Sequence, residues 1–65
     1  MENFETIDDI LNQLPKALYG GGLYMNYEMN GWWYCGYKNS VHHSCDNELK
    51  VALYDLFMKL KENGY

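Results

Sequence analysis

A chain of 65 residues is long enough for one domain and too short for two, so we expect a single domain over residues 1–65. Its net charge of −4 and its lack of arginine argue against a nucleic-acid-binding protein, because phosphate binding requires clustered Lys and Arg side chains. The first ten residues are acidic, and no apolar run approaches the ~20 residues that span a bilayer. Without a signal for export, the two cysteines favour reduced thiols in the cytoplasm.

The N-terminal segment is predicted to be a helix. Thr6 is a suitable N-cap, and Asp9 completes an acidic form of the capping box. Because Pro15 removes a backbone donor, we expect a kink there, or a stop near Leu14 followed by a short turn to Tyr19. The triple glycine at 20–22 is interpreted as a flexible connector, since phosphate-binding glycine loops follow a strand and open a helix. The apolar stripe of the helix comprises Ile7, Ile10, Leu11, Leu14 and Leu18.

Residues 23–38 are predicted to form a β-hairpin. Asn30-Gly31 is the preferred pair for a two-residue type I′ turn, which would place Tyr27 opposite Tyr34. Alternation then divides the side chains between two faces. The predicted core face holds Leu23, Met25, Tyr27, Met29, Trp32, Tyr34 and Gly36. The other face holds Tyr24, Asn26, Glu28, Trp33, Cys35 and Tyr37, and it is too aromatic for an ordinary solvated face.

The rest of the chain predicts a short third strand and a final helix. The strand is expected at 41–43, and Ser44 or Asp46 is expected to cap the helix. The fold class is therefore α+β, with a small antiparallel sheet, an N-terminal and a C-terminal helix, and the order α-β-β-(β)-α. Both helices on one face is the simplest packing, and one helix on each face is the alternative. The apolar stripe of the last helix comprises Leu49, Ala52, Leu53, Leu56, Phe57 and Leu60, flanked by Val51, Tyr54 and Met58.

The succession of GWWYCGY, a polar turn and DNELKVALYDLFMKLKENG resembles the small phage-encoded helix–strands–helix proteins of the phage αβα-sandwich type. The resemblance covers about the second half of the chain. It implies a bacterial cytoplasm and a phage or prophage accessory role. Such proteins are often non-enzymatic, and some antagonise host defence. The resemblance supplies no catalytic residues.

Four residues have side chains suited to tetrahedral zinc: Cys35, His42, His43 and Cys45. Their spacing lacks a Cys-x2-Cys pair, and neighbouring residues of a strand point to opposite faces. We therefore expect no metal and no cofactor, with zinc as the weaker alternative. A Cys35–Cys45 disulfide is disfavoured by the cytoplasmic setting. A Cys/His nucleophile is conceivable, with Cys45 near a helix N-terminus. A domain of this size has little depth for a pocket, so we expect a non-enzyme.

The aromatic face is the best candidate for a binding site, because Trp and Tyr are enriched at binding hot spots. The candidate residues are Tyr24, Trp33, Tyr37, Lys38, His42 and His43. The partner would be a host protein or a small nucleotide-like ligand, and a homodimer or higher homo-oligomer is expected. The sequence thus predicts a non-enzymatic phage-type accessory protein that antagonises host defence by binding. The alternatives are an oligomeric structural or regulatory subunit and, less favoured, a Cys/His-dependent enzyme.

Overall fold

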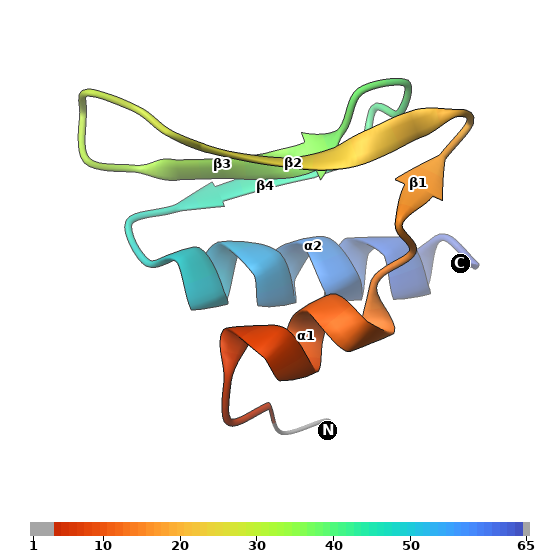
Figure 1. The fold of residues 1–65 in the computed structure, drawn as a ribbon, viewed down its shortest axis with the longest axis horizontal. Coiled ribbons are helices and arrows are strands. Elements are labelled where there is room, and N and C mark those ends of the chain that lie inside the picture. The colour runs from red at the N-terminus through yellow and green to blue at the C-terminus, as the bar shows by residue number, and fades with distance from the viewer. Residues whose placement is uncertain (1–3, 65) are drawn as a thin grey trace.

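The computed structural model describes residues 4–64 and contains two helices and four strands. The strands form one antiparallel sheet in the order β1-β2-β3-β4, and both helices lie on the same side of it (Figure 1). The predicted α+β class, with an N-terminal and a C-terminal helix, is confirmed. The elements are α1 (Ile7–Gln13), β1 (Ala17–Leu18), β2 (Gly21–Tyr27), β3 (Trp33–Tyr37), β4 (His43–Asp46) and α2 (Leu49–Glu62).

Helix α1 begins after the predicted N-cap Thr6 and ends at the predicted stop near Leu14. The Thr6 amide donates to Asp9 Oδ2 over 3.0 Å, and the Asp9 amide donates to Thr6 Oγ1 over 3.2 Å, which completes the predicted capping box. The helix stops at Leu14, whose backbone is extended as expected for a residue before proline. After Pro15 the chain forms β1, so the expected short turn to Tyr19 is replaced by a strand.

The triple glycine is a tight turn and the start of a strand, so its interpretation as a flexible connector is wrong. Tyr19 and Gly20 both have positive φ, at 51° and 80°, and form the two-residue turn between β1 and β2. Gly21 is buried, and a Cβ there would lie 2.6 Å from the backbone nitrogen of Asn39. The glycine therefore lets the β1–β2 turn pack against the loop that follows β3.

The hairpin of β2 and β3 has a three-residue loop, so the predicted two-residue loop is wrong. The Gly31 amide donates to the Glu28 carbonyl over 3.0 Å, and the Glu28 amide donates to the Trp32 carbonyl over 2.9 Å. Gly31 has a φ of 85°, as in a type I turn followed by a bulge. The extra loop residue pairs Tyr27 with Trp33 and shifts the register by one.

A one-residue shift turns every side chain of β3 to the other side of the sheet. Cys35 and Tyr37, predicted to lie outside the core, face the helices and are 0% and 1% exposed. Tyr34, predicted as core, lies on the opposite side. We call the side that faces the helices the inner face. Met25 and Tyr27 lie on it as predicted, but they remain 39% and 62% exposed because they lie beyond the helices.

The third predicted strand exists, but as β4 it lies later than expected. Ser44 and Asp46, the two residues predicted to cap the last helix, are part of this strand, and the N-cap position of α2 is Glu48. Ser44 is buried in β4, and its hydroxyl donates to the Ala52 carbonyl of α2. Asp46 Oδ2 accepts a hydrogen bond from the Glu48 amide over 2.9 Å, which shapes the turn into α2. The predicted stripe of α2 is confirmed: Ala52, Leu53, Leu56, Phe57 and Leu60 are buried, and Leu49 is half-buried.

Helix α2 lies between the sheet and α1 (Figure 1). It packs against β3 and β4 on one side and against α1 on the other. Phe4 adds ring contacts to Tyr54 and Phe57, with centroid distances of 5.8 and 5.3 Å. Tyr54 and Met58, the predicted apolar flank, therefore pack within the chain, whereas Val51 is 37% exposed.

Candidate functional site: the open face of the sheet

The sheet has one face that no helix covers within residues 4–64, and we call it the outer face. Both helices lie on the other side, as Figure 1 shows. The strand registers place two rows of residues across the outer face. One row is Tyr24, Gly36 and His43, and the other is Asn26, Tyr34 and Cys45.

In the first row the Tyr24 side chain lies against Gly36. A Cβ at Gly36 would lie 2.9 Å from the hydroxyl oxygen of Tyr24 and 2.9 Å from the Cβ of His43. Glycine therefore lets the Tyr24 hydroxyl approach both the β3 backbone and His43. The His43 Nδ1 lies 2.9 Å from the Val41 carbonyl. A proton on Nδ1 makes this a hydrogen bond and leaves Nε2 as an acceptor.

In the second row the Tyr34 side chain is held by the hairpin loop. The Asn30 side-chain amide donates to the Tyr34 hydroxyl over 3.2 Å, and its carbonyl oxygen accepts from the Trp32 amide over 3.0 Å. These two hydrogen bonds fix the ring of Tyr34 relative to the loop. Trp32, beside it at the end of the hairpin, is 41% exposed.

The structure separates the residues that the sequence assigned to one binding face. Tyr24 and His43 lie on the outer face, and Lys38 and His42 lie in the loop between β3 and β4. Trp33 packs on the core from the inner face, with its ring 5.0 Å from that of Tyr27. Because the loop shifts the register, the prediction that Trp33 and Tyr37 lie on the same face as Tyr24 is wrong.

Tyr37 is a core residue with a polar end. Its hydroxyl donates to the Pro15 carbonyl, and its ring is 1% exposed. Burial raises the pKa of this phenol to about 12, so it stays neutral at ordinary pH. A residue held in this way cannot stack a ligand on the surface.

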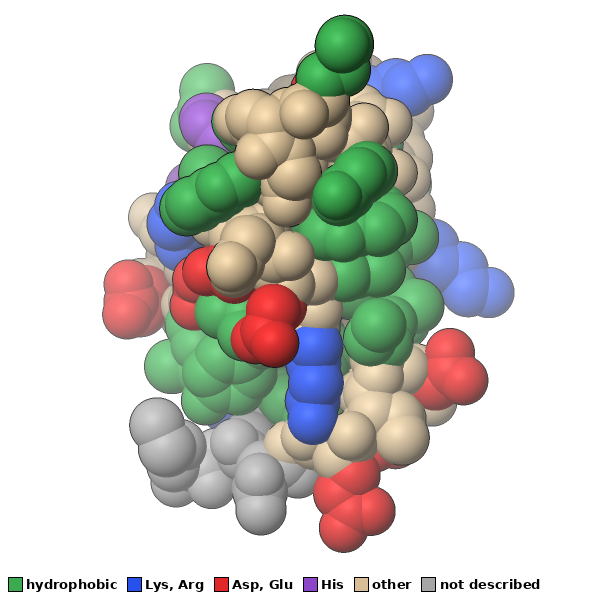
Figure 2. Space-filling view, turned by 90° about the vertical axis from the view of Figure 1, so that its left-hand side faces the viewer, with side chains coloured by type: hydrophobic (Ala, Val, Ile, Leu, Met, Phe, Trp, Pro, Cys, Tyr) green, Lys and Arg blue, Asp and Glu red, His purple; other side chains and the backbone are tan. Residues whose placement is uncertain are grey.

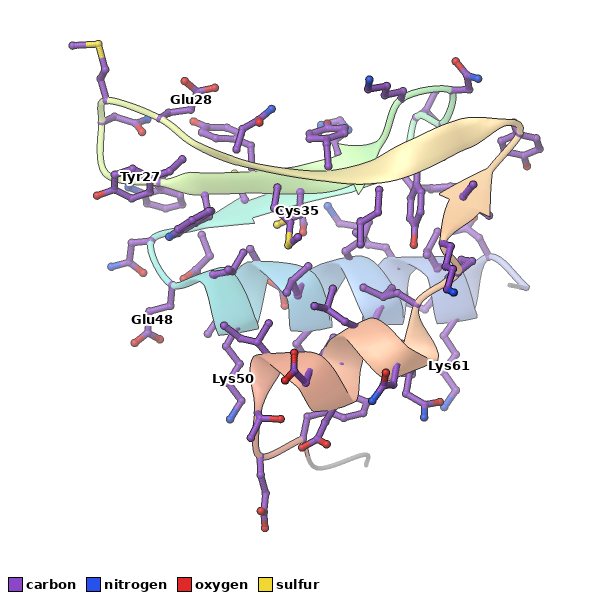
Figure 3. The ribbon with its side chains drawn as sticks, in the orientation of Figure 1. Tyr27, Glu28, Cys35, Glu48, Lys50 and Lys61 are labelled. Carbon is purple, nitrogen blue, oxygen red and sulfur yellow. The ribbon has the colours of Figure 1, made fainter. Side chains whose placement is uncertain are left out.

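The two cysteines differ in position and reactivity. Cys35 points toward α2 from the inner face (Figure 3), whereas Cys45 is exposed on the outer face. Burial, with a smaller contribution from the charge of Cys45, raises the pKa of the Cys35 thiol to about 11, which makes it a poor nucleophile. Cys45, expected near a helix N-terminus, lies within β4, and α2 begins only at Leu49.

The alternative zinc set is not assembled. Within residues 4–64, no three His, Cys, Asp or Glu side chains are grouped closely enough to hold a metal ion. Cys35 lies on the inner face, while His43 and Cys45 lie on the outer face, so the sheet separates them. The set of Cys35, His42, His43 and Cys45 is therefore wrong as a metal site.

The sequence reasoning missed Tyr34 and Cys45 as outer-face residues. The signal that would have found them is Met29-Asn30-Gly31 taken as a three-residue loop with glycine at its last position. In the described part of the chain, no helix is both long enough and apolar enough to cross a bilayer. Comparisons with protein-family models, curated proteins and solved structures found no match for this chain.

Proposed function

We propose that this chain is a small non-enzymatic binding protein whose outer face contacts a partner protein. The observation that carries the proposal is the packing of both helices on one side, which leaves Tyr24 and Tyr34 on a face that no described helix covers. Tyrosine provides a large rigid contact area together with a hydroxyl for hydrogen bonding, which is why it is frequent at binding hot spots.

The chemistry of the outer face favours a protein partner over a phosphate-rich one. None of the six residues in its two rows is Lys, Arg, Asp or Glu, and five have polar groups that can donate or accept hydrogen bonds. A flat base stacked on Tyr24 is the second candidate, because Tyr24 pairs with Gly36 near the end of β3 and the loop that follows β3 contains Lys38 and His42, which could meet a phosphate. An oligomeric structural subunit is the third.

The setting we propose is the cytoplasm of a bacterial host, with a phage accessory role against host defence. This part rests on the resemblance of the second half of the chain to small phage proteins. A defence antagonist needs only to cover or hold a host component, so an open aromatic face without a catalytic group suits the role.

Cys45 allows a direct test of the outer face. A benzophenone maleimide would attach there, because Cys45 is exposed whereas Cys35 is buried with a raised pKa. The matched control is a Cys45→Ser, Val51→Cys double variant, which moves the label to an exposed position of α2. We expect illumination in bacterial lysate to cross-link one host protein to position 45 and not to position 51. Equal labelling from both positions would refute the assignment.

A second experiment addresses the defence role. The chain would be expressed in bacteria that carry different defence systems, and plating of a restricted phage would be counted. We expect plating to rise with the native chain and with Val51→Arg, and to stay low with Cys45→Arg on the outer face. Native mass spectrometry of the purified protein reports any copurifying nucleotide, which would favour the second candidate.

A further inference from the structure

One edge of the sheet is open along most of its length. Strand β1 has only two residues, and it pairs with Gly21 and Gly22 at the start of β2. The last contact on this side is the hydrogen bond from the Leu23 amide to the Lys16 carbonyl, at 3.3 Å. Beyond it, no strand of residues 4–64 lies beside residues 25–27, which we call the β2 edge.

The backbone groups of the β2 edge point away from the sheet. The Glu28 amide bonds to Trp32 and the Lys38 amide bonds to Gly22, so the even-numbered residues of β2 face β3. In an antiparallel pair the residues between them direct their N–H and C=O groups to the other side. Met25 and Tyr27 therefore present two donors and two acceptors to the open side.

Large apolar side chains are exposed on the β2 edge, beside Asn26, and at the hairpin end next to it. Met25, Tyr27, Met29 and Trp32 are 39%, 62%, 104% and 41% exposed. Figure 2, which looks onto the hairpin end of the molecule, shows hydrophobic side chains grouped in the upper half, where the sheet lies. Natural edge strands usually carry Lys or Pro that prevents pairing with other chains, and β2 contains neither.

The opposite edge of the sheet is protected. The Lys59 ammonium on α2 donates to the His43 carbonyl of β4 over 2.6 Å. A lysine placed on an edge strand hinders the approach of another strand. Pairing through the β2 edge would therefore close after two copies and not continue into a fibre.

We propose that the β2 edge pairs with the β2 edge of a second copy of this chain, antiparallel and about a two-fold axis at Asn26. This register places Met25 of each copy opposite Tyr27 of the other copy, which makes two such pairs. Because both residues direct their backbone groups outward, the two pairs make four hydrogen bonds. The two sheets become one continuous sheet, and the Met25 and Tyr27 side chains meet on the inner face beside Trp33.

Charge favours a second copy as the occupant. Glu28 is the charged residue nearest the β2 edge on the hairpin, and the proposed register places it opposite Tyr24 of the second copy, so like charges do not meet. Lys16 lies at the end of the β2 edge, in line with the incoming strand, because its carbonyl holds Leu23. Glu28 of the second copy thus arrives beside Lys16, and the two-fold axis repeats this pair.

Sedimentation equilibrium between about 1 and about 500 µM tests the dimer, whose population depends on concentration. We expect the native chain to dimerise and Met25→Lys to raise the dissociation constant at least about tenfold, because a lysine at the β2 edge must lose its hydration. Val51→Lys, which introduces the same charge on α2, should leave the constant unchanged. A native chain that stays monomeric, or equal constants for the two variants, would overturn the proposal.

A charge exchange tests the register independently of the proposed function. Lys16→Glu should weaken the dimer up to about fivefold, and adding Glu28→Lys should restore it. Within one chain these residues lie about 17 Å apart along β2, so restoration reports contact between copies. Hydrogen exchange at the Met25 and Tyr27 amides should slow as the dimer forms. Amides that slow only when bacterial lysate protein is added would assign the β2 edge to a different chain and overturn the proposal.

Discussion

The hydroxyl of Tyr37 donates a hydrogen bond to the backbone carbonyl of Pro15, so the second-last strand of the sheet is joined to the segment that ends α1. Pro15 is half-buried and has no amide to donate. Without the Tyr37 hydroxyl, its carbonyl would lose this hydrogen-bond partner inside the protein. The contact fixes where the chain leaves the helix layer and enters the sheet.

Removing that hydroxyl should destabilise the fold. We expect Tyr37→Phe to lower the free energy of unfolding by about 1–2 kcal/mol, because the carbonyl loses its partner inside the protein. Urea denaturation followed by tryptophan fluorescence measures the change. Tyr27→Phe is the matched control, since its ring is 62% exposed, and it should change stability by less than about 0.5 kcal/mol. Equal effects of the two variants would contradict the role of the Pro15 contact.

Stability should fall at alkaline pH because two buried groups resist ionisation. Folding raises the pKa of Cys35 from 9.0 to about 11 and that of Tyr37 from 10.0 to about 12. Above pH 9.0 the unfolded chain loses these protons before the folded chain does, so the free energy of unfolding declines until about pH 12. Below that window the contribution is complete and constant. Urea titrations across the window measure the slope.

The control for the alkaline window is the Cys35→Ala, Tyr37→Phe double variant. It is less stable at every pH, but its free energy of unfolding should decline less steeply between pH 9.0 and about pH 12. All other residues are the same in both proteins, so the difference between the two slopes reports Cys35 and Tyr37 alone. A slope identical to that of the native chain would show that these two groups are not the cause.

Two adjacent glycines should respond in opposite ways to the same substitution. A Cβ at Gly21 would lie 2.6 Å from the Asn39 nitrogen, whereas a Cβ at Gly22 meets no heavy atom within 4 Å. We expect Gly21→Ala to cost about 1–3 kcal/mol through overpacking against backbone. Gly22→Ala should be neutral or stabilise by up to about 1 kcal/mol, because alanine restricts the unfolded chain. Thermal denaturation separates the two outcomes, and the reverse order would contradict the tight packing of this turn.

The sequence predicted what depends on local spacing and failed where one residue of loop length decided the outcome. The Thr6–Asp9 capping box follows from the spacing of two residues, and the apolar stripe of α2 follows from helical periodicity. Both are confirmed. The hairpin was also predicted, but Asn30-Gly31 suits a two-residue loop as well as the end of a three-residue loop. The choice between them sets which side of β3 faces the helices, and periodicity along β3 does not decide it, because both of its faces are aromatic.

Deleting Met29 tests this explanation of the register. Without it, Asn30 and Gly31 alone connect Glu28 to Trp32, which is the two-residue loop they favour, and Tyr27 stays opposite Trp33. Met29 is fully exposed, so we expect the free energy of unfolding to change by less than about 1 kcal/mol. Nuclear Overhauser contacts between the rings of Tyr27 and Trp33 report the register.

The matched deletion is that of Asn30. It places Met29 at a loop position that requires positive φ, which costs about 1–2 kcal/mol for a residue other than glycine. It also removes the hydrogen bonds to Trp32 and Tyr34. We therefore expect the Asn30 deletion to be clearly less stable than the Met29 deletion. A Met29 deletion in which Tyr27 contacts Tyr34 instead would show that packing does not hold β3 in place.

Lys59 should determine whether association stops at two copies. Its ammonium donates a hydrogen bond to the His43 carbonyl on the β4 edge. Lys59→Ala removes this hydrogen bond and the charge from the edge while leaving the helix backbone intact. We expect Lys59→Ala to form species larger than the dimer in sedimentation velocity, and to do so more at high salt because repulsion between the acidic copies is then screened. Lys61→Ala, which removes the same charge from a side chain that lies over Phe57, should not. If both variants sediment like the native chain, the lysine does not protect the edge, and the closure of the sheet after two copies would need another cause.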